Sequence, residues 1–332
     1  MRRAEARRAR SLDEIPRTLG EADFLLGVND EARQGALRFA DESGGPFLAP
    51  AEDRAIPPLV DLPKLLSAAE HFLNEDESAE DLRILLAPGS SLGGARPKAS
   101  VRDTDRQLAI AKFPRKDDEH NIVAWEAVAL TLAEKAGVLV PSWRMINVSE
   151  KPVLLIRRFD RIGNIRVPFL SAMSMLQAKD NDTHSYLEIA DALRQYGAEP
   201  SNDLAQLWRR IVFSILISNT DDHLRNHGFL YERHKGWLLS PAYDLNPTPV
   251  EIKPRILTTT IDLDDGTASL DLALSVIKDF RLSTNDAKLI IKEVGTVIAK
   301  WRTVAQSLGL SKNEIDRMAS AFEHADSDLA LK

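Results

Sequence analysis

Apolar residues recur at helical spacing in the segment before residue 219. These residues are Leu207, Trp208, Ile211, Val212, Ile215 and Leu216. Their spacing predicts a buried helix that ends near Asn219, and the apolar run at 228–231 predicts a short strand beyond it. A polar loop is therefore expected at residues 220–227, held between two regular elements.

The same periodicity makes the chain beyond Pro168 mainly helical. Helices are predicted over residues 171–178, 185–196, 203–218, 269–279, 284–308 and 312–325. A further short strand is predicted at residues 236–239. We expect this half of the chain to form the larger, helical part of the protein.

The chain before Pro168 has shorter apolar runs, which are typical of strands. Strands are predicted at residues 22–28, 35–39, 108–114, 138–141 and 152–161, and helices within 62–85 and from 122 to Gly137. The passage from the first strand to about Pro63 is rich in Pro and Gly. It cannot make a core of its own, so we expect it to pack on the following residues or on a partner.

Composition also changes near residue 168. We therefore predict an α+β fold with two lobes, a β-rich N-terminal lobe at residues 22–168 and a helical C-terminal lobe at residues 169–332. Residues 1–21 are expected to form a flexible basic tail.

Composition and charge narrow the class of protein. The chain has 332 residues, 44% of them apolar, which is enough to bury a substantial core. Its net charge of −7 argues against a surface built to clamp nucleic acid, although residues 1–10 are locally basic. The absence of cysteine excludes disulfides and thiolate chemistry, and no signal peptide or long apolar run is present. We expect a cytoplasmic protein.

Two residues of the polar loop have the spacing of a phosphoryl-transfer site. Asp221 and Asn226 are five apart, which is the interval between the catalytic Asp and the metal-binding Asn of the protein-kinase catalytic loop. A second carboxylate, Asp244, follows after the strand at 236–239. Phosphoryl transfer needs one carboxylate to orient the attacking hydroxyl and oxygen ligands to hold Mg²⁺. Seen singly, each of these three residues is equally well explained as a turn or cap residue.

The polar loop also contains His223 and His227, an i, i+4 pair that suggests zinc. Leu224 stands where a metalloprotease has its glutamate, and the chain has no cysteine to complete a site. The pair therefore gives little support to a zinc site.

A second candidate site lies in the N-terminal half, where residues 87–101 are rich in glycine and include Lys98. Glycines allow backbone N–H groups to converge on an anion. The segment is not a Walker A loop, because Ala95 and Arg96 replace the required Lys-Ser/Thr pair. A Gly-Gly turn in a hairpin is the commoner explanation of such a segment.

Lys112 lies among apolar residues of the predicted strand at 108–114. It is either the surface charge of an edge strand or a phosphate ligand. Glu126, in the helix that follows, has the place of the glutamate that pairs with the strand lysine in protein kinases.

Taken in order, four segments resemble the HipA family of bacterial toxin kinases. The segments are Ser91-Leu92-Gly93-Gly94-Ala95-Arg96-Pro97-Lys98, Ala111-Lys112-Phe113-Pro114, Thr220-Asp221-Asp222-His223-Leu224-Arg225-Asn226 and Ser240-Pro241-Ala242-Tyr243-Asp244. The resemblance runs from about Asp23 to Phe322. It implies a two-lobed, protein-kinase-like fold and an ATP- and Mg²⁺-dependent serine/threonine kinase.

The resemblance also implies roles for individual residues. Asp221 would be the catalytic carboxylate, and Asn226 and Asp244 would hold Mg²⁺. The implied ATP-binding residues are Gly93, Gly94, Ala95, Arg96, Lys98, Lys112, Leu170, Ala172, His223, Arg225 and Asn226. Ser91 stands at the position of a self-phosphorylated serine, with Ser90 as a second candidate.

One departure from the family concerns the beginning of the chain. Full-length HipA proteins carry a small leading domain before the part that corresponds to Asp23, so this chain is most similar to the short HipT-like kinases. In such systems the expected partners are a separate small HipS-like protein and a HipB-like helix-turn-helix antitoxin, with DNA contacted only through the antitoxin. The substrate implied by the family is an aminoacyl-tRNA synthetase.

Two other functions stay open. A kinase-like protein without turnover can serve as a repressor subunit that binds a DNA-binding partner, but the presence of Asp221, Asn226, Asp244 and Lys112 argues against this. Small-molecule phosphotransferases share the general arrangement of the loop and the metal carboxylate.

Overall fold

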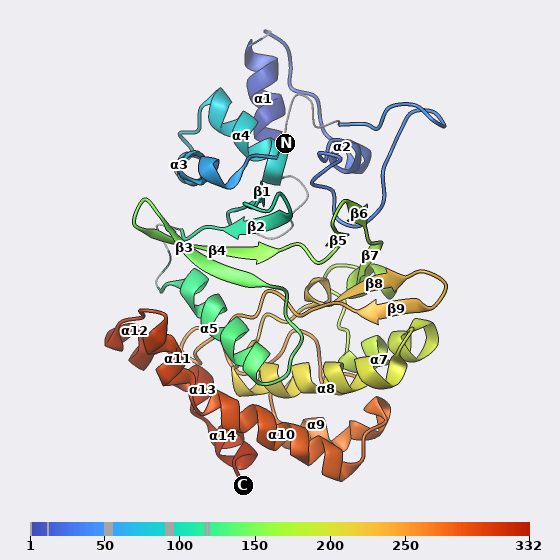
Figure 1. Cartoon of the computed structure of the whole chain (residues 1–332), viewed down its shortest axis with the longest axis vertical. Helices are drawn as coiled ribbons and strands as arrows, with labels where there is room; N and C mark the ends of the chain where they lie inside the picture. The colour runs from blue at the N-terminus through green and yellow to red at the C-terminus, as the bar shows by residue number, and fades with distance from the viewer. Residues whose placement is uncertain (1, 12, 50–55, 90–95, 116–117, 119) are drawn as a thin grey trace. The chain divides into compact units, whose positions relative to one another are not determined.

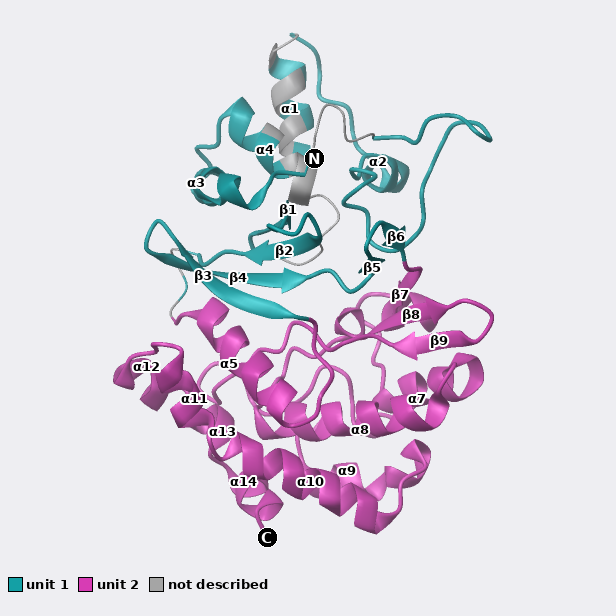
Figure 2. Cartoon of the chain, viewed as in Figure 1, with its two compact units in different colours: residues 1–119, 142–166 teal, residues 120–141, 167–332 magenta. Residues whose placement is uncertain are grey.

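The computed structural model describes residues 2–11, 13–49, 56–89, 96–115, 118 and 120–332 (Figure 1). The chain forms two compact units (Figure 2). Unit 1 contains residues 1–119 and 142–166, and unit 2 contains residues 120–141 and 167–332. The predicted lobe boundary at residue 168 and the flexible tail at 1–21 stay predictions.

Unit 1 is built on a four-stranded antiparallel sheet in the order β1-β2-β4-β3. The strands are β1 (Lys98–Arg102), β2 (Leu108–Lys112), β3 (Trp143–Val148) and β4 (Lys151–Arg157). One face of this sheet contributes small apolar side chains, such as Ala99 and Ala111, to a core shared with Leu65 and Leu66. Those leucines belong to α3 (Leu62–Leu73), which is followed by α4 (Ala79–Gly89).

The strands predicted at residues 22–28 and 35–39 are not present. Residues Glu21–Leu26 form helix α2, because the Asp23 carboxylate accepts a hydrogen bond from the Gly20 N–H (2.9 Å) and caps the helix start. The basic residues Arg2–Ser11 form helix α1.

Side chains from another part of unit 1 hold residues 31–35 in an irregular conformation. The Gly35 N–H donates to Asp160 Oδ2 (2.7 Å), and Arg161 donates to the carbonyl oxygens of Gly35 and Arg33. These contacts use backbone groups that a strand would pair with a neighbouring strand. Beyond them, β5 (Arg161–Ile162) and β6 (Ile165–Arg166) form a hairpin.

Unit 2 contains a small antiparallel sheet and most of the helices. The sheet has the order β7-β8-β9 and consists of β7 (Phe169–Ser171), β8 (Gly228–Glu232) and β9 (Gly236–Leu239). The strands predicted around 228–231 and 236–239 are thus confirmed. The strand predicted at 138–141 is not found, and there the N–H of Leu139 donates to the Gln206 side chain (3.2 Å).

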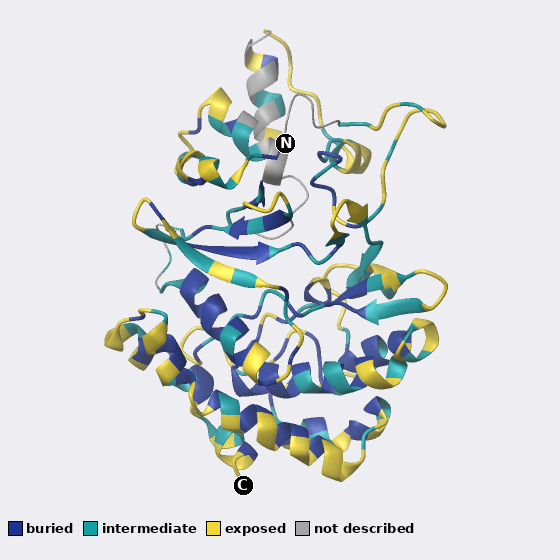
Figure 3. Cartoon of the chain, viewed as in Figure 1, coloured by how far each residue is buried: buried dark blue, intermediate teal, exposed yellow. Residues whose placement is uncertain are grey.

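Helix α8 (Pro200–Leu216) lies at the centre of unit 2. The apolar residues that predicted it are fully buried, Figure 3 shows much of the helix as buried, and the helix ends a little before Asn219. Around it are α5 (Ile122–Lys135), α6 (Ala172–Met175), α7 (Tyr186–Tyr196), α9 (Leu270–Ser275), α10 (Thr284–Ile298), α11 (Trp301–Ser307), α12 (Lys312–Arg317), α13 (Ala319–Phe322) and α14 (Ala325–Ala330). Short 3₁₀ turns are η1 (Leu59–Asp61) in unit 1, and η2 (Leu224–Asn226) and η3 (Ile277–Phe280) in unit 2.

Aromatic side chains join the outer helices of unit 2. Trp301 and Phe322 stack with their ring centroids 4.5 Å apart, and the ring centroid of Trp125 lies 6.1 Å from both.

The single helices predicted over 284–308 and 312–325 are each divided into shorter helices. No helix in the described part of the chain is long and apolar enough to span a bilayer.

Candidate active site

Helix α8 and the residues directly after it hold two loops of unit 2 in place. The polar loop comprises residues 220–227, and the second loop comprises residues 240–248. Within α8, Asp203 Oδ2 accepts the Leu239 N–H (3.1 Å), and Arg210 donates to the Ser240 carbonyl oxygen. The end of β9 and the start of the second loop are therefore attached to the helix.

Two residues after α8 attach the far side of the second loop. Asn219 is fully buried, and its Oδ1 accepts the Asn246 N–H (3.1 Å). The carbonyl oxygen of Ser218 accepts the Thr248 N–H (3.1 Å). Asp244 therefore lies in a loop that is hydrogen-bonded on both sides to α8 and its C-terminal extension.

Asp221 is presented to solvent by a backbone that is itself well ordered by hydrogen bonds. Its side chain is 69% exposed. Its carbonyl oxygen accepts the His223 N–H (3.0 Å) and the Asn226 side-chain amide (3.1 Å). This combination of an exposed carboxylate and a hydrogen-bonded backbone suits a group that must meet an incoming hydroxyl.

The next residue, Asp222, has the opposite environment and anchors the loop. Its buried carboxylate accepts from the hydroxyls of Tyr186 and Ser214, and His227 Nε2 lies 3.1 Å from its Oδ1. Thr259 donates to its carbonyl oxygen from both N–H (3.1 Å) and Oγ1 (2.6 Å).

The charge of Asp222 is stabilised by these partners. Burial raises the pKa of the Asp222 carboxyl, but the opposing effects of His227 and of the hydroxyl hydrogen bonds leave that pKa below its ordinary value. Sequence reasoning missed Asp222, although the adjacent pair of aspartates was a signal that the two have different tasks.

The two predicted metal ligands have the chemistry that Mg²⁺ requires. Asn226 donates its Nδ2 to the Asp221 carbonyl oxygen, which leaves its Oδ1 as the atom for a cation. Asp244 is half-buried and has a left-handed backbone, with φ of 61°, a conformation that Asp tolerates better than most residues. A carboxylate and an amide oxygen are hard ligands, so this pair fits Mg²⁺.

Other predicted nucleotide residues of unit 2 lie beside the polar loop. The Ala172 N–H donates to the His227 carbonyl oxygen (2.8 Å), and Leu170 pairs with Phe229 across β7 and β8. Within the described residues, His223 Nδ1 is buried and has no hydrogen-bond partner, so it is a polar atom suited to a ligand.

Arg225 differs from these residues because its side chain is already engaged. It forms an exposed ion pair with Asp180, with an Nη2 to Oδ1 distance of 2.5 Å. Its carbonyl oxygen accepts the Tyr243 hydroxyl (2.7 Å), which joins the polar loop to the second loop. A nucleotide contact by the Arg225 guanidinium stays a prediction.

Two of the predicted phosphate ligands are cross-strand partners in unit 1. Lys98 of β1 pairs directly with Lys112 of β2, so both side chains project from the sheet face opposite the one that buries Ala99 and Ala111. Arg96, just before β1, forms an ion pair with Asp118 (2.8 Å).

Some of the predicted residues are not tested by the structure. Ser90, Ser91, Gly93, Gly94 and Ala95 lie outside the described residues. Glu126 is buried in α5 of unit 2, whereas Lys112 belongs to unit 1, so their ion pair stays a prediction.

Lys253 is a basic residue at the site that the sequence pattern did not reveal. Its Nζ donates to the Thr220 carbonyl oxygen (3.1 Å) and lies 4.0 Å from Asp221 Oδ1. No motif or spacing connects it with the polar loop, because it arrives from a later segment of the chain. A cation here lies beside the Asp221 carboxylate and can face a transferring phosphoryl group.

The family of the chain follows from a match to the HipA-like C-terminal domain over residues 90–327. The chain belongs to this family. The matched range contains the polar loop, the second loop and the strands that carry Lys98 and Lys112.

Relatives with curated sequences are similar over part of their length. The putative kinase Y4dM of Sinorhizobium fredii (strain NBRC 101917 / NGR234) is 34% identical over 139 residues, which cover 37% of this chain and 33% of that protein. A putative kinase of Haemophilus influenzae (strain ATCC 51907 / DSM 11121 / KW20 / Rd) is 28% identical over 138 residues, covering 41% of this chain and 37% of that protein. The chain thus spans little more than a third of these two relatives.

Solved structures with the same fold include two from characterised systems. One is a chain of the Shewanella oneidensis MR-1 toxin-antitoxin complex of HipA, HipB and operator DNA, with a TM-score of 0.56, 16% identity, and coverage of 73% of this chain and 63% of that chain. The other is the Helicobacter pylori proinflammatory kinase CtkA, with a TM-score of 0.55, 16% identity, and coverage of 72% and 92%. At this identity the likeness concerns the fold, and the predicted α+β, kinase-like fold class is confirmed.

The hydrogen bond between β9 and Asp203 predicts how the stability of the protein depends on pH. Burial raises the pKa of the Asp203 carboxyl from 3.8 to about 6. The stability that this carboxyl contributes to the folded protein is therefore fully present below about pH 4 and is lost as the pH rises through about 6. Asn in its place stays neutral and still accepts the Leu239 N–H. We expect the free energy of unfolding of Asp203→Asn to exceed that of the wild type by an amount that grows from about pH 4 to about pH 6 and is constant above about pH 7, as measured by urea denaturation.

The matched control for this experiment is Asp271→Asn, which changes an exposed carboxylate in the first turn of α9. Its difference from the wild type is expected to stay constant across the same pH range. A constant difference for Asp203→Asn as well would contradict the prediction.

Proposed function

We propose that the chain is an ATP- and Mg²⁺-dependent serine/threonine protein kinase. The observation that carries this proposal is the exposed Asp221 on a loop fixed by buried Asp222, with the Asn226 amide turned back onto the same loop. Membership of the HipA-like family and the kinase-like fold support the reading. The names of the curated relatives, which are putative kinases, agree with it.

In the proposed reaction Asp221 orients the substrate hydroxyl and accepts its proton as the phosphoryl group is transferred. Asn226 and Asp244 hold Mg²⁺, which when bound neutralises charge on the nucleotide phosphates. Lys98, Lys112 and the loop from Gly93 contact the phosphates of ATP. Lys253 lies beside the Asp221 carboxylate and helps to position it.

Substitution of the two carboxylates separates their roles. Asp221→Asn removes the proton acceptor, so we expect phosphoryl transfer to fall by about 10²- to 10⁴-fold while ATP binding is kept. Asp244→Asn removes a ligand charge, so Mg²⁺-ATP should bind more weakly. Transfer of label from γ-³²P-ATP to lysate proteins, together with a nucleotide titration, measures both effects.

The control is Asp264→Asn, which changes an exposed carboxylate away from both loops and should leave both readouts unchanged. Full label transfer by Asp221→Asn would refute the assigned role. Label that appears only in a small molecule would favour a small-molecule phosphotransferase. ATP binding without any transfer by the wild type would favour a repressor subunit without turnover.

We further propose that this kinase is the toxin of a bacterial toxin-antitoxin system with an aminoacyl-tRNA synthetase as its substrate. The similar fold in the HipA, HipB and operator DNA complex supports the toxin assignment. The synthetase comes from the family resemblance. A phosphoproteome recorded before and after brief expression, with Asp221→Asn expressed in parallel, identifies the substrate or excludes a synthetase.

A HipB-like helix-turn-helix antitoxin is the partner that the fold likeness favours, with a small HipS-like protein as a second partner. We expect the chain, purified from its native operon, to carry one or both of these proteins and to be inactive with them bound. DNA should be retained only when the antitoxin is present. The toxin proposal would lose its main support if the chain were isolated from its native operon without a partner and if cells expressing the chain alone grew normally.

Autophosphorylation of the glycine-rich loop is proposed as the regulatory step, with Ser91 as the acceptor and Ser90 as the alternative. A phosphate adds about −1.5 to −2 charges at neutral pH, so it competes for the surface that binds ATP phosphates. We expect intact-mass analysis after incubation with Mg²⁺ and ATP to show one added phosphate on the wild type. Ser91→Ala should lose it, whereas Ser90→Ala should keep it.

The same reaction with Asp221→Asn is the control for modification by another kinase. An active wild-type enzyme without added phosphate would exclude this form of regulation and leave the kinase assignment standing.

A further inference from the structure

Residues 252–259, which we call the flanking segment, run beside the polar loop of unit 2. Thr258 donates its N–H (3.2 Å) and its Oγ1 hydroxyl (2.9 Å) to the carbonyl oxygen of Thr220. The next residue donates its N–H to the carbonyl oxygen of Asp222 (3.1 Å). Asp221 lies between these two acceptors in the chain, so the flanking segment is its direct neighbour.

Side chains of the flanking segment alternate between the interior and the surface. Leu257 and Thr259 are buried, whereas Ile256 is 54% exposed. In the neighbouring part of the polar loop, Asp222 is buried and Asp221 is exposed. Successive side chains of an extended chain point to opposite sides. Because the buried side chains of both stretches face the interior, Asp221 and Ile256 lie on the same outer surface.

Ile252 lies close to Asp221 as well, through its neighbour Lys253. The Lys253 ammonium nitrogen is 4.0 Å from Asp221 Oδ1, and Ile252 is 53% exposed. Ile256 stands two residues before Thr258, a separation of about 7 Å at most along the backbone. An extended substrate chain advances about 3.3 Å per residue, so residues within about four positions of an acceptor hydroxyl at Asp221 can reach both isoleucines.

The Arg255 side chain fixes the backbone between the two isoleucines. Its Nε donates to Ser218 Oγ (3.1 Å), and its Nη2 donates to the carbonyl oxygen of Ile215 (3.1 Å). Its Nη1 pairs with Asp326 (2.9 Å). Polar contacts made elsewhere in the flanking segment therefore hold the isoleucines at the surface, and a bound partner would need to order little further chain.

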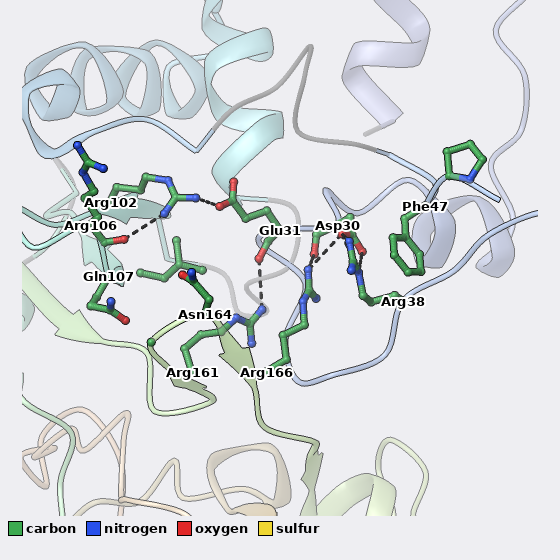
Figure 4. Close-up of a pocket in the computed structure, with 13 residues that line it drawn as sticks. Asp30, Glu31, Arg38, Phe47, Arg102, Arg106, Gln107, Arg161, Asn164 and Arg166 are labelled. Carbon is green, nitrogen blue, oxygen red and sulfur yellow. Dashed lines mark hydrogen bonds and ion pairs between the residues drawn. The ribbon is translucent and has the colours of Figure 1, made fainter. Parts of the chain in front are cut away.

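A pocket in unit 1 has a different character (Figure 4). Its charged side chains are joined to one another by ion pairs, as the dashed lines of Figure 4 show. Asp30 pairs with Arg38 and Arg166. Glu31 pairs with Arg102. These groups stabilise each other within the chain, whereas an exposed isoleucine gains free energy when another apolar group covers it.

From the shared surface of Asp221, Ile252 and Ile256, we propose that the two isoleucines select the acceptor segment of a protein substrate. They contact an apolar residue that lies within about four positions of the acceptor serine or threonine. This inference rests on the proposed kinase function, since it takes Asp221 as the residue that meets the acceptor hydroxyl. The isoleucines determine specificity and touch none of the reacting atoms.

Phosphorylation of synthetic peptides by the full chain, with Mg²⁺ and γ-³²P-ATP, tests this proposal. Each peptide has a central serine and one fixed residue, which is leucine, alanine, glutamate or lysine in turn, at each of the four positions on either side. We expect leucine to be preferred to alanine about tenfold in kcat/KM at one or more positions, because covering an aliphatic side chain contributes about that factor.

Replacement of both isoleucines identifies the residues that make this selection. We expect the double variant Ile252→Ser/Ile256→Ser to lose the preference for leucine, through a KM for the leucine peptide that rises about tenfold while kcat is kept. The double variant Ile252→Leu/Ile256→Leu keeps both apolar side chains and should keep the preference. Melting curves of both variants should coincide with that of the wild type, since the replaced side chains are exposed.

The matched control is Leu289→Ser, which removes a similarly exposed apolar side chain (57%) from α10. It should select peptides as the wild type does. An equal loss of selection in Leu289→Ser would contradict the proposal, because the effect would then not be specific to the surface beside Asp221.

Four further results would overturn the proposal. They are equal use of leucine and alanine peptides by the wild type, a stronger preference for glutamate than for leucine, a leucine preference that survives in Ile252→Ser/Ile256→Ser, and label in lysate proteins with none in any peptide. A wild type that labels neither peptides nor lysate proteins would refute the kinase proposal itself, and this inference with it. Failure of the selection and failure of the kinase proposal are therefore distinguishable.

Discussion

The hydrogen bonds between helix α8 and its neighbouring loops are the constraint on which the candidate site depends. Asp203 and Arg210 hold the start of the second loop, and Asn219 and Ser218 hold its far side. All four act from one buried helix or from the residues that directly follow it. The backbone of the second loop is therefore fixed independently of the side chains that meet solvent at the site.

This arrangement requires charged groups in the interior, which are costly unless they are paired. Arg210 is buried, and burial lowers its pKa to about 10, while the nearby Asp222 and Asp203 favour its charged form. Asp222 in turn is surrounded by hydroxyl donors and His227. A similar solution holds the irregular segment of unit 1, where Asp160 is shared between Arg158 and Arg161.

Local patterns in the sequence were sufficient to predict helix α8, the polar loop after it and the α+β fold class. The interval from Asp221 to Asn226 predicted that both residues lie on this loop, as they do. The sequence did not reveal the residues whose roles depend on tertiary contacts. Lys253 reaches Asp221 from a distant segment, and nothing in its neighbourhood marks it.

Errors in the predicted strands have the same origin. The apolar run beginning at Ala22 looks like a strand, but the Asp23 carboxylate caps a helix there. The run at 35–39 lacks a partner strand, since Asp160 and Arg161 occupy backbone groups at Gly35. A short apolar run does not reveal whether its backbone groups will be satisfied by another strand or by side chains.

The spacing of attachments along the polar loop has a consequence for how its length can change. Thr220 is held through its carbonyl oxygen by Lys253 and Thr258, and Asp222 is held in the same way by Thr259. The one residue between these points is Asp221, so a deletion there removes the exposed carboxylate itself, and an insertion there displaces it relative to the buried one. The loop is thus intolerant of insertion and deletion, whereas the turn between β8 and β9, which carries Arg233, is exposed to solvent.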